Sequence, residues 1–326
     1  MKAAAYIGGL LGLALLLALV LRTDLVAMLQ TLEQAGWRLL WLVPYRALFF
    51  LLYALGWRCL LEPSDPARRA GLAFLFWVTN IREAIDRLLP VASVGGGVVA
   101  VRMLRWRGLP APPVAASVII EVLLTLFAAY LFTAVGLLWL LHLNAQASDY
   151  HRLLLGFLLS LPVPIVLMLV LRYGSVFHRL QGMLRPLVGT ASWAGGAAAS
   201  AASLDAELQA GLRRRWRLAA AATLQLAAFV SGAFEVWLAL RLFGHPVGVG
   251  VAVALESMTQ AVRHLAFFVP AGLGVQEAGL ILIGQTLGIN GELALALSMA
   301  KRMREVLCGV PALLSWQWAE GRRLRA

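Results

Sequence analysis

The stretch 267–280, FFVPAGLGVQEAGL, interrupts an apolar region that is long enough to cross a membrane. It contains a proline, three glycines, a glutamine and a glutamate. Proline and glycine disfavour a continuous helix, and the backbone groups that a break frees are tolerated in a bilayer only against protein or a watery cavity. This stretch, with Glu277 beside the break, therefore predicts a polar site at membrane depth.

The rest of the composition is that of a helical membrane protein. Of the 326 residues, 61% are hydrophobic and 13% are charged, and the mean hydropathy is +0.81. A transmembrane barrel would show short alternating strands instead of long runs of Leu, Ala and Val. We expect an all-α, polytopic integral membrane protein with about seven to eight spans. The apolar runs fall near 3–21, 39–60, 72–100, 113–141, 153–171, 217–242, 248–268, 270–289 and 292–318.

Basic residues predict how the chain is oriented. The net charge of +12 comes from 26 Arg and two Lys, and in so apolar a chain it indicates orientation and anionic lipid headgroups, not nucleic acid. If segment 72–100 dips in and returns to the same side, seventeen basic residues face the cytoplasm and four face the opposite side. The seventeen are Lys2, Arg58, Arg68, Arg69, Arg102, Arg105, Arg107, Arg172, Arg179, Arg185, Arg213, Arg214, Arg215, Arg217, Arg322, Arg323 and Arg325. The four are Arg22, Arg38, Arg152 and Arg241. Both termini are then cytoplasmic.

Two interrupted segments divide the chain into halves. In the first half, 1–172, the segment 72–100 reads IREAIDRLLP and then VASVGGG; in the second half, 216–326, the segment 248–289 contains the opening stretch. Corresponding interrupted segments in two halves are typical of transporters built from inverted repeats, with a binding site near the midplane. We therefore expect two broken or re-entrant hairpins in an inverted-repeat arrangement.

The stretch 173–215 connects the halves and is expected to lie in the cytoplasm or on the membrane interface. Its early part, VFHRLQGMLRPL, has the apolar spacing of an interfacial helix. For the tract ASWAGGAAASAAS at 191–203, a helix and a flexible linker are both compatible with the composition.

Fourteen charged residues fall at membrane depth, where each is costly unless it is paired or faces water. They are Arg46, Arg82, Glu83, Asp86, Arg87, Glu121, Glu235, Glu256, Arg263, Glu277, Lys301, Arg302, Arg304 and Glu305. A separation of four residues predicts three pairs within helices: Arg82 with Asp86, Glu83 with Arg87, and Lys301 with Glu305. Each pair could equally be a salt bridge that only holds helices together.

The candidate substrate-binding residues surround the two breaks. They are Arg82, Glu83, Asp86, Arg87, Pro90, Gly95, Gly96, Glu121, Glu256, Arg263, Pro270, Gly272, Gly274, Gln276, Glu277, Lys301, Arg302 and Glu305. We expect Glu277 to contact a basic residue or the opposite hairpin within a central cavity. The sequence contains no nucleophile elbow, HExxH motif, P-loop or dinucleotide fingerprint, so we expect no enzyme activity, no cofactor and no metal.

Three segments carry a family resemblance: NIREAIDRLLPVASVGG (80–96), FFVPAGLGVQEAGLILIG (267–284) and SMAKRMREVLCGVPALLSWQ (298–317). They resemble the flippase-like membrane family related to the transmembrane region of lysylphosphatidylglycerol synthases, and its hopanoid-biosynthesis-associated branch in particular. The resemblance extends over nearly the whole chain and implies a bacterial inner-membrane protein that moves a lipid between leaflets. It implies that membrane lipids are partners, either a hopanoid or an anionic phospholipid. The protein partners it implies are a second copy of the chain, in a homodimer, or hopanoid-pathway proteins.

Two departures from that family limit what the resemblance carries over. No aminoacyl-transferase domain follows the last apolar run, so lysyl transfer is not expected, and Gly97 stands where related sequences are expected to have an acidic residue. The alternative function is a non-transporting scaffold or accessory subunit for envelope-lipid enzymes, which would have all its charges locked in pairs. An intramembrane enzyme would need a convergent nucleophile and base.

Overall fold

The computed structural model describes residues 25–88, 95–143, 150–179, 193–265, 269 and 272–325, and this part of the chain is helical without any strand. The first half contains α2 (Leu25–Ala35), the 3-10 helix η1 (Gly36–Trp41), α3 (Leu42–Leu61), η2 (Glu62–Ser64), α4 (Leu72–Leu88), α5 (Gly95–Arg105), α6 (Ala111–Leu143), α7 (Tyr150–Ser160) and α8 (Pro162–Tyr173). After α10 (Trp193–Leu212) come α11 (Arg215–Leu242), α12 (Val249–Leu265), α13 (Val275–Thr286) and α14 (Gly291–Arg325). The expected all-α membrane fold is confirmed.

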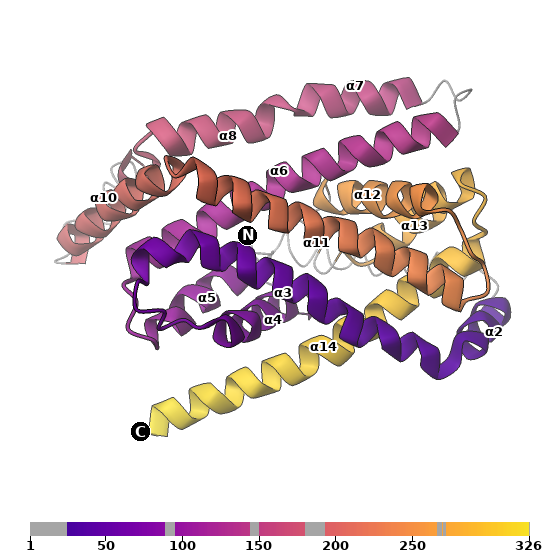
Figure 1. Cartoon of the computed structure of the whole chain (residues 1–326), viewed down its shortest axis with the longest axis horizontal. Helices are drawn as coiled ribbons and strands as arrows, with labels where there is room; N and C mark the ends of the chain where they lie inside the picture. The colour runs from indigo at the N-terminus through magenta and orange to yellow at the C-terminus, as the bar shows by residue number, and fades with distance from the viewer. Residues whose placement is uncertain are drawn as a thin grey trace.

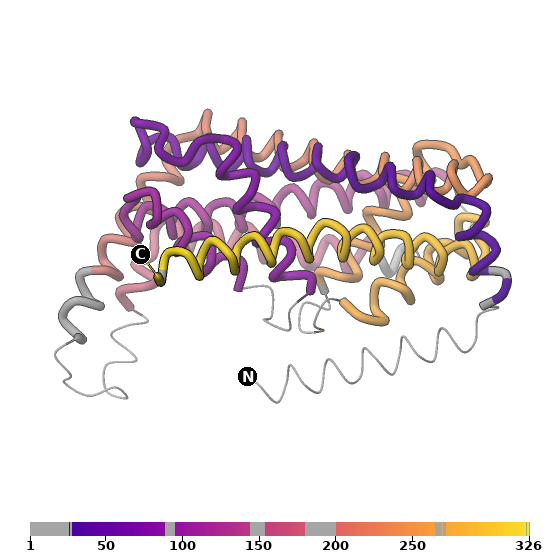
Figure 2. The backbone as a smooth tube through the Cα atoms, turned by 90° about the horizontal axis from the view of Figure 1, so that it is seen from below, coloured from indigo at the N-terminus to yellow at the C-terminus, as the bar shows by residue number. Residues whose placement is uncertain are grey.

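Each half contains a long helix, a hairpin of two shorter helices and a second long helix. In the first half these are α3, the pair α4 and α5, and α6; in the second they are α11, the pair α12 and α13, and α14. Figure 1 shows that α3 and α11 run in opposite directions, as do α6 and α14. Figure 2 shows α3 and α11 in one layer and α14 in another.

The contacts between the halves have the same symmetry. Helix α3 packs on its counterpart α11, α12 packs on α6, and α4 packs on α14. Each hairpin thus lies against the second long helix of the other half. This reciprocal packing, together with the opposed helix directions, is the predicted inverted-repeat arrangement.

The hairpin helices are too short to cross a bilayer one by one. Helices α4 and α12 have 17 residues each, α5 has 11 and α13 has 12. At a rise of about 1.5 Å per residue they extend about 17–26 Å, which is less than the roughly 30 Å of a hydrocarbon core. The two helices of each pair pack side by side, with α4 and α5 toward one end of the molecule and α12 and α13 toward the other (Figure 1).

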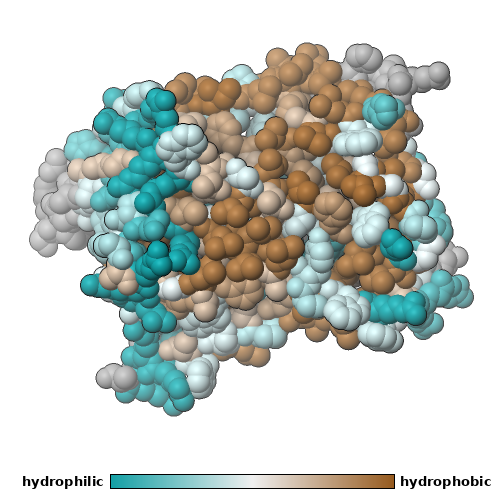
Figure 3. All heavy atoms as spheres, in the orientation of Figure 1, coloured by the Kyte–Doolittle hydropathy of each residue, from teal (hydrophilic) through white to brown (hydrophobic). Residues whose placement is uncertain are grey.

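Four described segments are long and apolar enough to span the membrane: 28–64, 111–143, 154–173 and 215–242. Figure 3 shows an apolar belt next to a hydrophilic edge. At that edge α3, α5, α8 and α14 end and α11 begins, and arginines occupy these helix ends (Figure 1). The sequence predicts that many basic residues face one side of the membrane. Those at the described helix ends lie together at one end of the structure.

The tract at 191–203 is a helix from residue 193 onward, so a flexible linker is the wrong interpretation for that part. Helix α10 packs on α6 and α8, where Leu208 and Leu212 are buried in a cluster with Ile120 and Leu171. Apolar contacts of Leu208 and Leu212, further along the same helix, hold α10 against its neighbours. Most of the stretch VFHRLQGMLRPL lies outside the described residues.

Glycines lie at two of the helix contacts between the halves. A Cβ added at Gly136 in α6 would lie 2.6 Å from the Ser257 Cβ of α12. A Cβ added at Gly309 in α14 would lie 2.6 Å from Leu88 Cδ1 and 3.3 Å from Ala84 Cβ of α4. Both symmetry-related contacts thus depend on a missing side chain, as in other membrane helix pairs.

We expect Gly136→Leu to destabilise the protein because the larger side chain must push α12 away from α6. Overpacking of a close contact typically costs about 1–3 kcal/mol. Gly156→Leu is the matched control, since nothing lies within 4 Å of a Cβ added at that exposed position. Thermal unfolding in detergent measures both variants, and equal melting temperatures would show that the glycine at 136 is not required.

Candidate functional site

A partly open cavity of about 290 Å³ lies between the two halves. Five helices line it: α3, α4 and α6 from the first half, and α11 and α12 from the second. The lining residues are Arg46, Phe49, Tyr53, Thr79, Arg82, Glu83, Asp86, Arg87, Glu121, Val122, Thr125, Ala228, Phe229, Gly232, Glu256, Gln260, Arg263 and His264. Both hairpins therefore present charged side chains to one space.

Some of the sequence-predicted site residues line this cavity and others do not. Those that line it are Arg82, Glu83, Asp86, Arg87, Glu121, Glu256 and Arg263. Those described elsewhere are Gly95, Gly96, Gly272, Gly274, Gln276, Glu277, Lys301, Arg302 and Glu305. Pro90 and Pro270 lie outside the described residues.

Two buried ion pairs cross between helices at the cavity wall. The Arg82 guanidinium donates to Glu121 over 2.5 Å and lies 4.9 Å from the ring centroid of Trp57. The Lys301 ammonium donates to Glu256 over 2.6 Å, and Gln260 donates to the same carboxylate over 2.8 Å. These contacts satisfy charges that would be costly to bury alone.

A closed ring of six charged side chains joins α3, α4, α11 and α14 beside the cavity. Glu83 accepts from Arg87 Nε and from Arg46 Nη2, both over 2.9 Å. The other Arg46 nitrogen, Nη1, lies 3.6 Å from Glu235, whose carboxylate lies 3.2 Å from Arg304 Nε.

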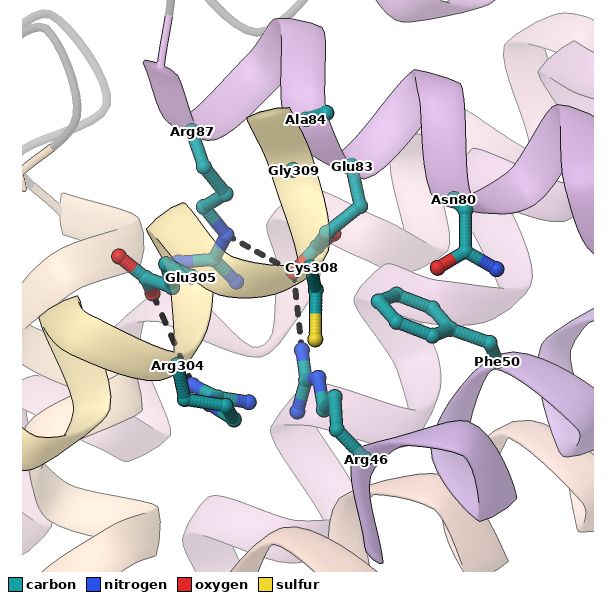
Figure 4. A pocket seen from close by; sticks show the side chains of 10 residues that line it. All are labelled: Arg46, Phe50, Asn80, Glu83, Ala84, Arg87, Arg304, Glu305, Cys308 and Gly309. Atoms are coloured by element: carbon teal, nitrogen blue, oxygen red, sulfur yellow. Dashed lines mark hydrogen bonds and ion pairs between the residues drawn. The ribbon is translucent and has the colours of Figure 1, made fainter. Parts of the chain in front are cut away.

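Glu305 closes this ring. Its carboxylate lies 3.8 Å from Arg304 Nη2 and 3.9 Å from Arg87 Nη1. Figure 4 shows Arg46, Arg87 and Arg304 converging on the space between α3, α4 and α14. The space has a volume of about 10 Å³, which is the room that one water molecule needs. Three arginines and three glutamates make the ring neutral, and each half supplies two of its four helices.

Packing between helices changes two of the three predicted pairs. Glu83 and Arg87 pair as expected. The prediction for Arg82 with Asp86 is wrong, because Arg82 reaches Glu121 on α6 instead. The prediction for Lys301 with Glu305 is wrong too: Lys301 faces Glu256 on α12, while Glu305 forms ion pairs with Arg87, Arg302 and Arg304.

Asp86 and Arg263 lie at the hairpins and make other contacts. Asp86 accepts a hydrogen bond from the backbone N–H of Gly96 over 3.1 Å, which ties the start of α5 to α4. The aliphatic stem of Arg263 passes over Gly272, where a Cβ would lie 3.4 Å from Arg263 Cγ. Gly272 and Gly274 have φ of +60° and +74°, a backbone region that favours glycine, and Gly274 caps α13.

Glu277 contacts a basic residue, as the sequence predicts, but does not line the cavity. Its Oε1 accepts from Ser298 Oγ over 3.0 Å and from Arg302 Nε over 3.2 Å. The residue is fully buried between α13 and α14. The prediction that it lies in the central cavity differs from the structure, where no residue of α13 lines the cavity of about 290 Å³. Arg302 connects Glu277 to Glu305 and so to the ring.

Several lining or ring residues are absent from the predicted site. Arg46, Glu235 and Arg304 are charges at membrane depth in the sequence, but no spacing within a helix pairs them. The uncharged residues Tyr53 and Thr125 give no such indication, because single hydroxyl groups are common in membrane helices.

Among the described residues, no group of three or more His, Cys, Asp or Glu side chains could hold a metal ion.

Comparisons with known proteins identify the family. A comparison with curated proteins found no match, and a comparison with solved structures found none either. The family model described as the lysylphosphatidylglycerol synthase TM region matches residues 6–310, nearly the whole chain. The chain therefore belongs to the lysylphosphatidylglycerol synthase TM region family.

Proposed function

We propose that this protein moves an amphipathic lipid between the leaflets of a bacterial inner membrane. The observation that carries the proposal is a charged cavity to which two inverted hairpins both contribute. In transporters with inverted repeats, a site at the repeat interface is reached from alternate sides when one repeat moves against the other. The proposed cargo is a hopanoid or a related lipid with a polar head, following the family resemblance.

The size and lining of the cavity support the uptake of a headgroup. At about 290 Å³ it is at the lower limit of pockets that hold drug-sized molecules, about 300–1,000 Å³. A headgroup fits in this space while the apolar part of the lipid stays among the acyl chains. Charged and hydroxyl side chains replace the water that the headgroup loses.

We also propose an orientation for the protein in the membrane, its partners, and that it is not an enzyme. The arginine-rich end is cytoplasmic under the positive-inside rule, which places both termini in the cytoplasm. Membrane lipids are the substrates, and a second copy of the chain or hopanoid-pathway proteins are the proposed protein partners. The charged groups of the site bind and do not catalyse.

The closed ring of ion pairs favours a second candidate, a non-transporting scaffold for lipid-synthesising enzymes. Six side chains that neutralise one another across four helices are what a rigid scaffold would have. Lipid movement separates the two functions. We expect purified protein in liposomes to move labelled lipid faster than protein-free vesicles do. No movement above that background, across several lipid classes including hopanoids, would support the scaffold.

Val122→Trp tests whether transport uses the cavity. Val122 lines the cavity on α6 and is exposed, so a tryptophan there should fill space that a headgroup needs. We expect the rate of lipid movement to fall about tenfold, the effect of raising a barrier by about 1.4 kcal/mol. Leu131→Trp is the matched control, because Leu131 is exposed on the same helix and does not line the cavity. Equal rates for the two variants would contradict a route through this space.

A further inference from the structure

The pairing of charges in the cavity leaves one cation and one anion for a ligand. The lining contains four arginines and four carboxylates: Arg46, Arg82, Arg87 and Arg263, with Glu83, Asp86, Glu121 and Glu256. Arg46 and Arg87 share Glu83, Arg82 pairs with Glu121, and Glu256 pairs with Lys301. Among the residues that the structure describes, neither Arg263 nor Asp86 belongs to an ion pair with a nitrogen–oxygen distance of 4.0 Å or less.

These two residues belong to equivalent parts of the inverted repeat. Asp86 is in the last turn of α4, and Arg263 is near the end of α12, the counterpart of α4 in the second half. In the described part of the chain, the Asp86 carboxylate accepts one hydrogen bond, from Gly96 N, so it can accept more. The Arg263 guanidinium has five N–H donors, a geometry that suits phosphate oxygens.

Net charge limits which headgroup this pair accepts. The charged lining residues sum to zero, and a headgroup with a net charge would enter without compensation, which is costly away from water. A zwitterionic headgroup adds no net charge. Its phosphate can bind Arg263 while its ammonium donates to Asp86.

Resting on the proposed movement of a lipid between leaflets, and in place of a hopanoid as its cargo, we infer that the cargo headgroup joins a phosphate to a primary ammonium, as in phosphatidylethanolamine. Arg263 binds the phosphate and Asp86 binds the ammonium, one from each hairpin. A headgroup without the ammonium leaves Asp86 without a cation, and a quaternary ammonium cannot donate a hydrogen bond to it. The structure thus favours phosphatidylethanolamine over phosphatidylglycerol and over phosphatidylcholine.

The test compares lipids that carry the fluorophore on an acyl chain, so that every headgroup is intact. Purified full-length protein is reconstituted in liposomes with a trace of labelled phosphatidylethanolamine, phosphatidylglycerol or phosphatidylcholine. We expect phosphatidylethanolamine to move about tenfold faster than phosphatidylglycerol, the effect of one hydrogen bond between charged groups. Equal rates, or a faster rate for phosphatidylglycerol, would overturn the headgroup assignment and leave the proposed function intact.

Two variants test the residues that make the selection. Asp86→Asn removes the charge that faces the ammonium, so the rates for phosphatidylethanolamine and phosphatidylglycerol should become equal. Arg263→Gln should slow both phospholipids, since both have a phosphate. Glu33→Gln and Arg38→Gln are matched controls at exposed positions, and they should retain the wild-type ratio. An unchanged ratio in Asp86→Asn would overturn the role of that residue.

A binding measurement separates this inference from the proposed function. Protein extracted from vesicles with equal amounts of both phospholipids is analysed for retained lipid by native mass spectrometry. Selective retention of phosphatidylethanolamine without any lipid movement would uphold the headgroup and reject transport. Retention of both phospholipids in equal amounts would reject the headgroup assignment whether or not lipid moves.

Discussion

Arg304→Met should lower the free energy of unfolding by about 3–5 kcal/mol, the usual effect of removing one member of a buried ion pair. The Arg304 side chain is only 3% exposed, and it contacts both Glu235 and Glu305, which are 4% and 8% exposed. Methionine leaves Glu235 with Arg46 alone, at 3.6 Å. The free energy of unfolding can be measured by titrating SDS into mild-detergent micelles.

A double variant shows whether the loss comes from the uncompensated charge. In Arg304→Met with Glu235→Met, Arg46 still has Glu83 and Glu305 still has Arg87 and Arg302. Replacing a buried pair by apolar residues is often neutral or stabilising, so most of the stability should return. Arg325→Met, at an exposed position of the same helix, should change stability by no more than about 0.5 kcal/mol. A double variant as unstable as the single one would contradict a ring held by charge balance.

The fold could be predicted from the sequence as far as local chemistry determines it. Proline and glycine at the two breaks predict hairpins because they stop helices, and the structure has a hairpin at each place. The repeated order of long helix, broken segment and long helix predicts the inverted halves. The reciprocal packing of α12 on α6 and of α4 on α14 could not be predicted, because it depends on glycines whose neighbours lie more than 100 residues away.

The site could be predicted only in part, for the same reason. Spacing of four residues correctly joins Glu83 with Arg87, which share a helix and a face. It fails for Lys301 and Glu305, because Lys301 faces α12 and finds Glu256 at 2.6 Å. Spacing along a helix shows which side chains are neighbours, but many of the ion pairs form across helix contacts. Those contacts decide which charges are neutralised and which are available to a ligand.

Gly96 allows the start of α5 to pack closely against α4, the first-half hairpin helix that lines the cavity. A Cβ at this position would lie 2.8 Å from the carbonyl oxygen of Arg82, 3.0 Å from Arg82 Cα and 2.7 Å from Asp86 Oδ2. Two of these atoms belong to the backbone of α4 and cannot rotate away. Even Gly96→Ala must therefore separate α5 from α4 or displace Arg82 and Asp86, which both line the cavity.

We expect Gly96→Ala to lower the rate of lipid movement at least about tenfold, since a misplacement of about 1 Å at a site can cost more than that. Gly71→Ala is the matched control, because nothing lies within 4 Å of a Cβ there. The liposome assay measures the rate, and gel filtration checks that both variants are folded. A folded Gly96→Ala protein with the wild-type rate would show that transport does not depend on how α4 and α5 are held together. The contact between Gly96 and Asp86 would then stabilise the hairpin without positioning the site, because a shift of the carboxylate would have no effect on the lipid.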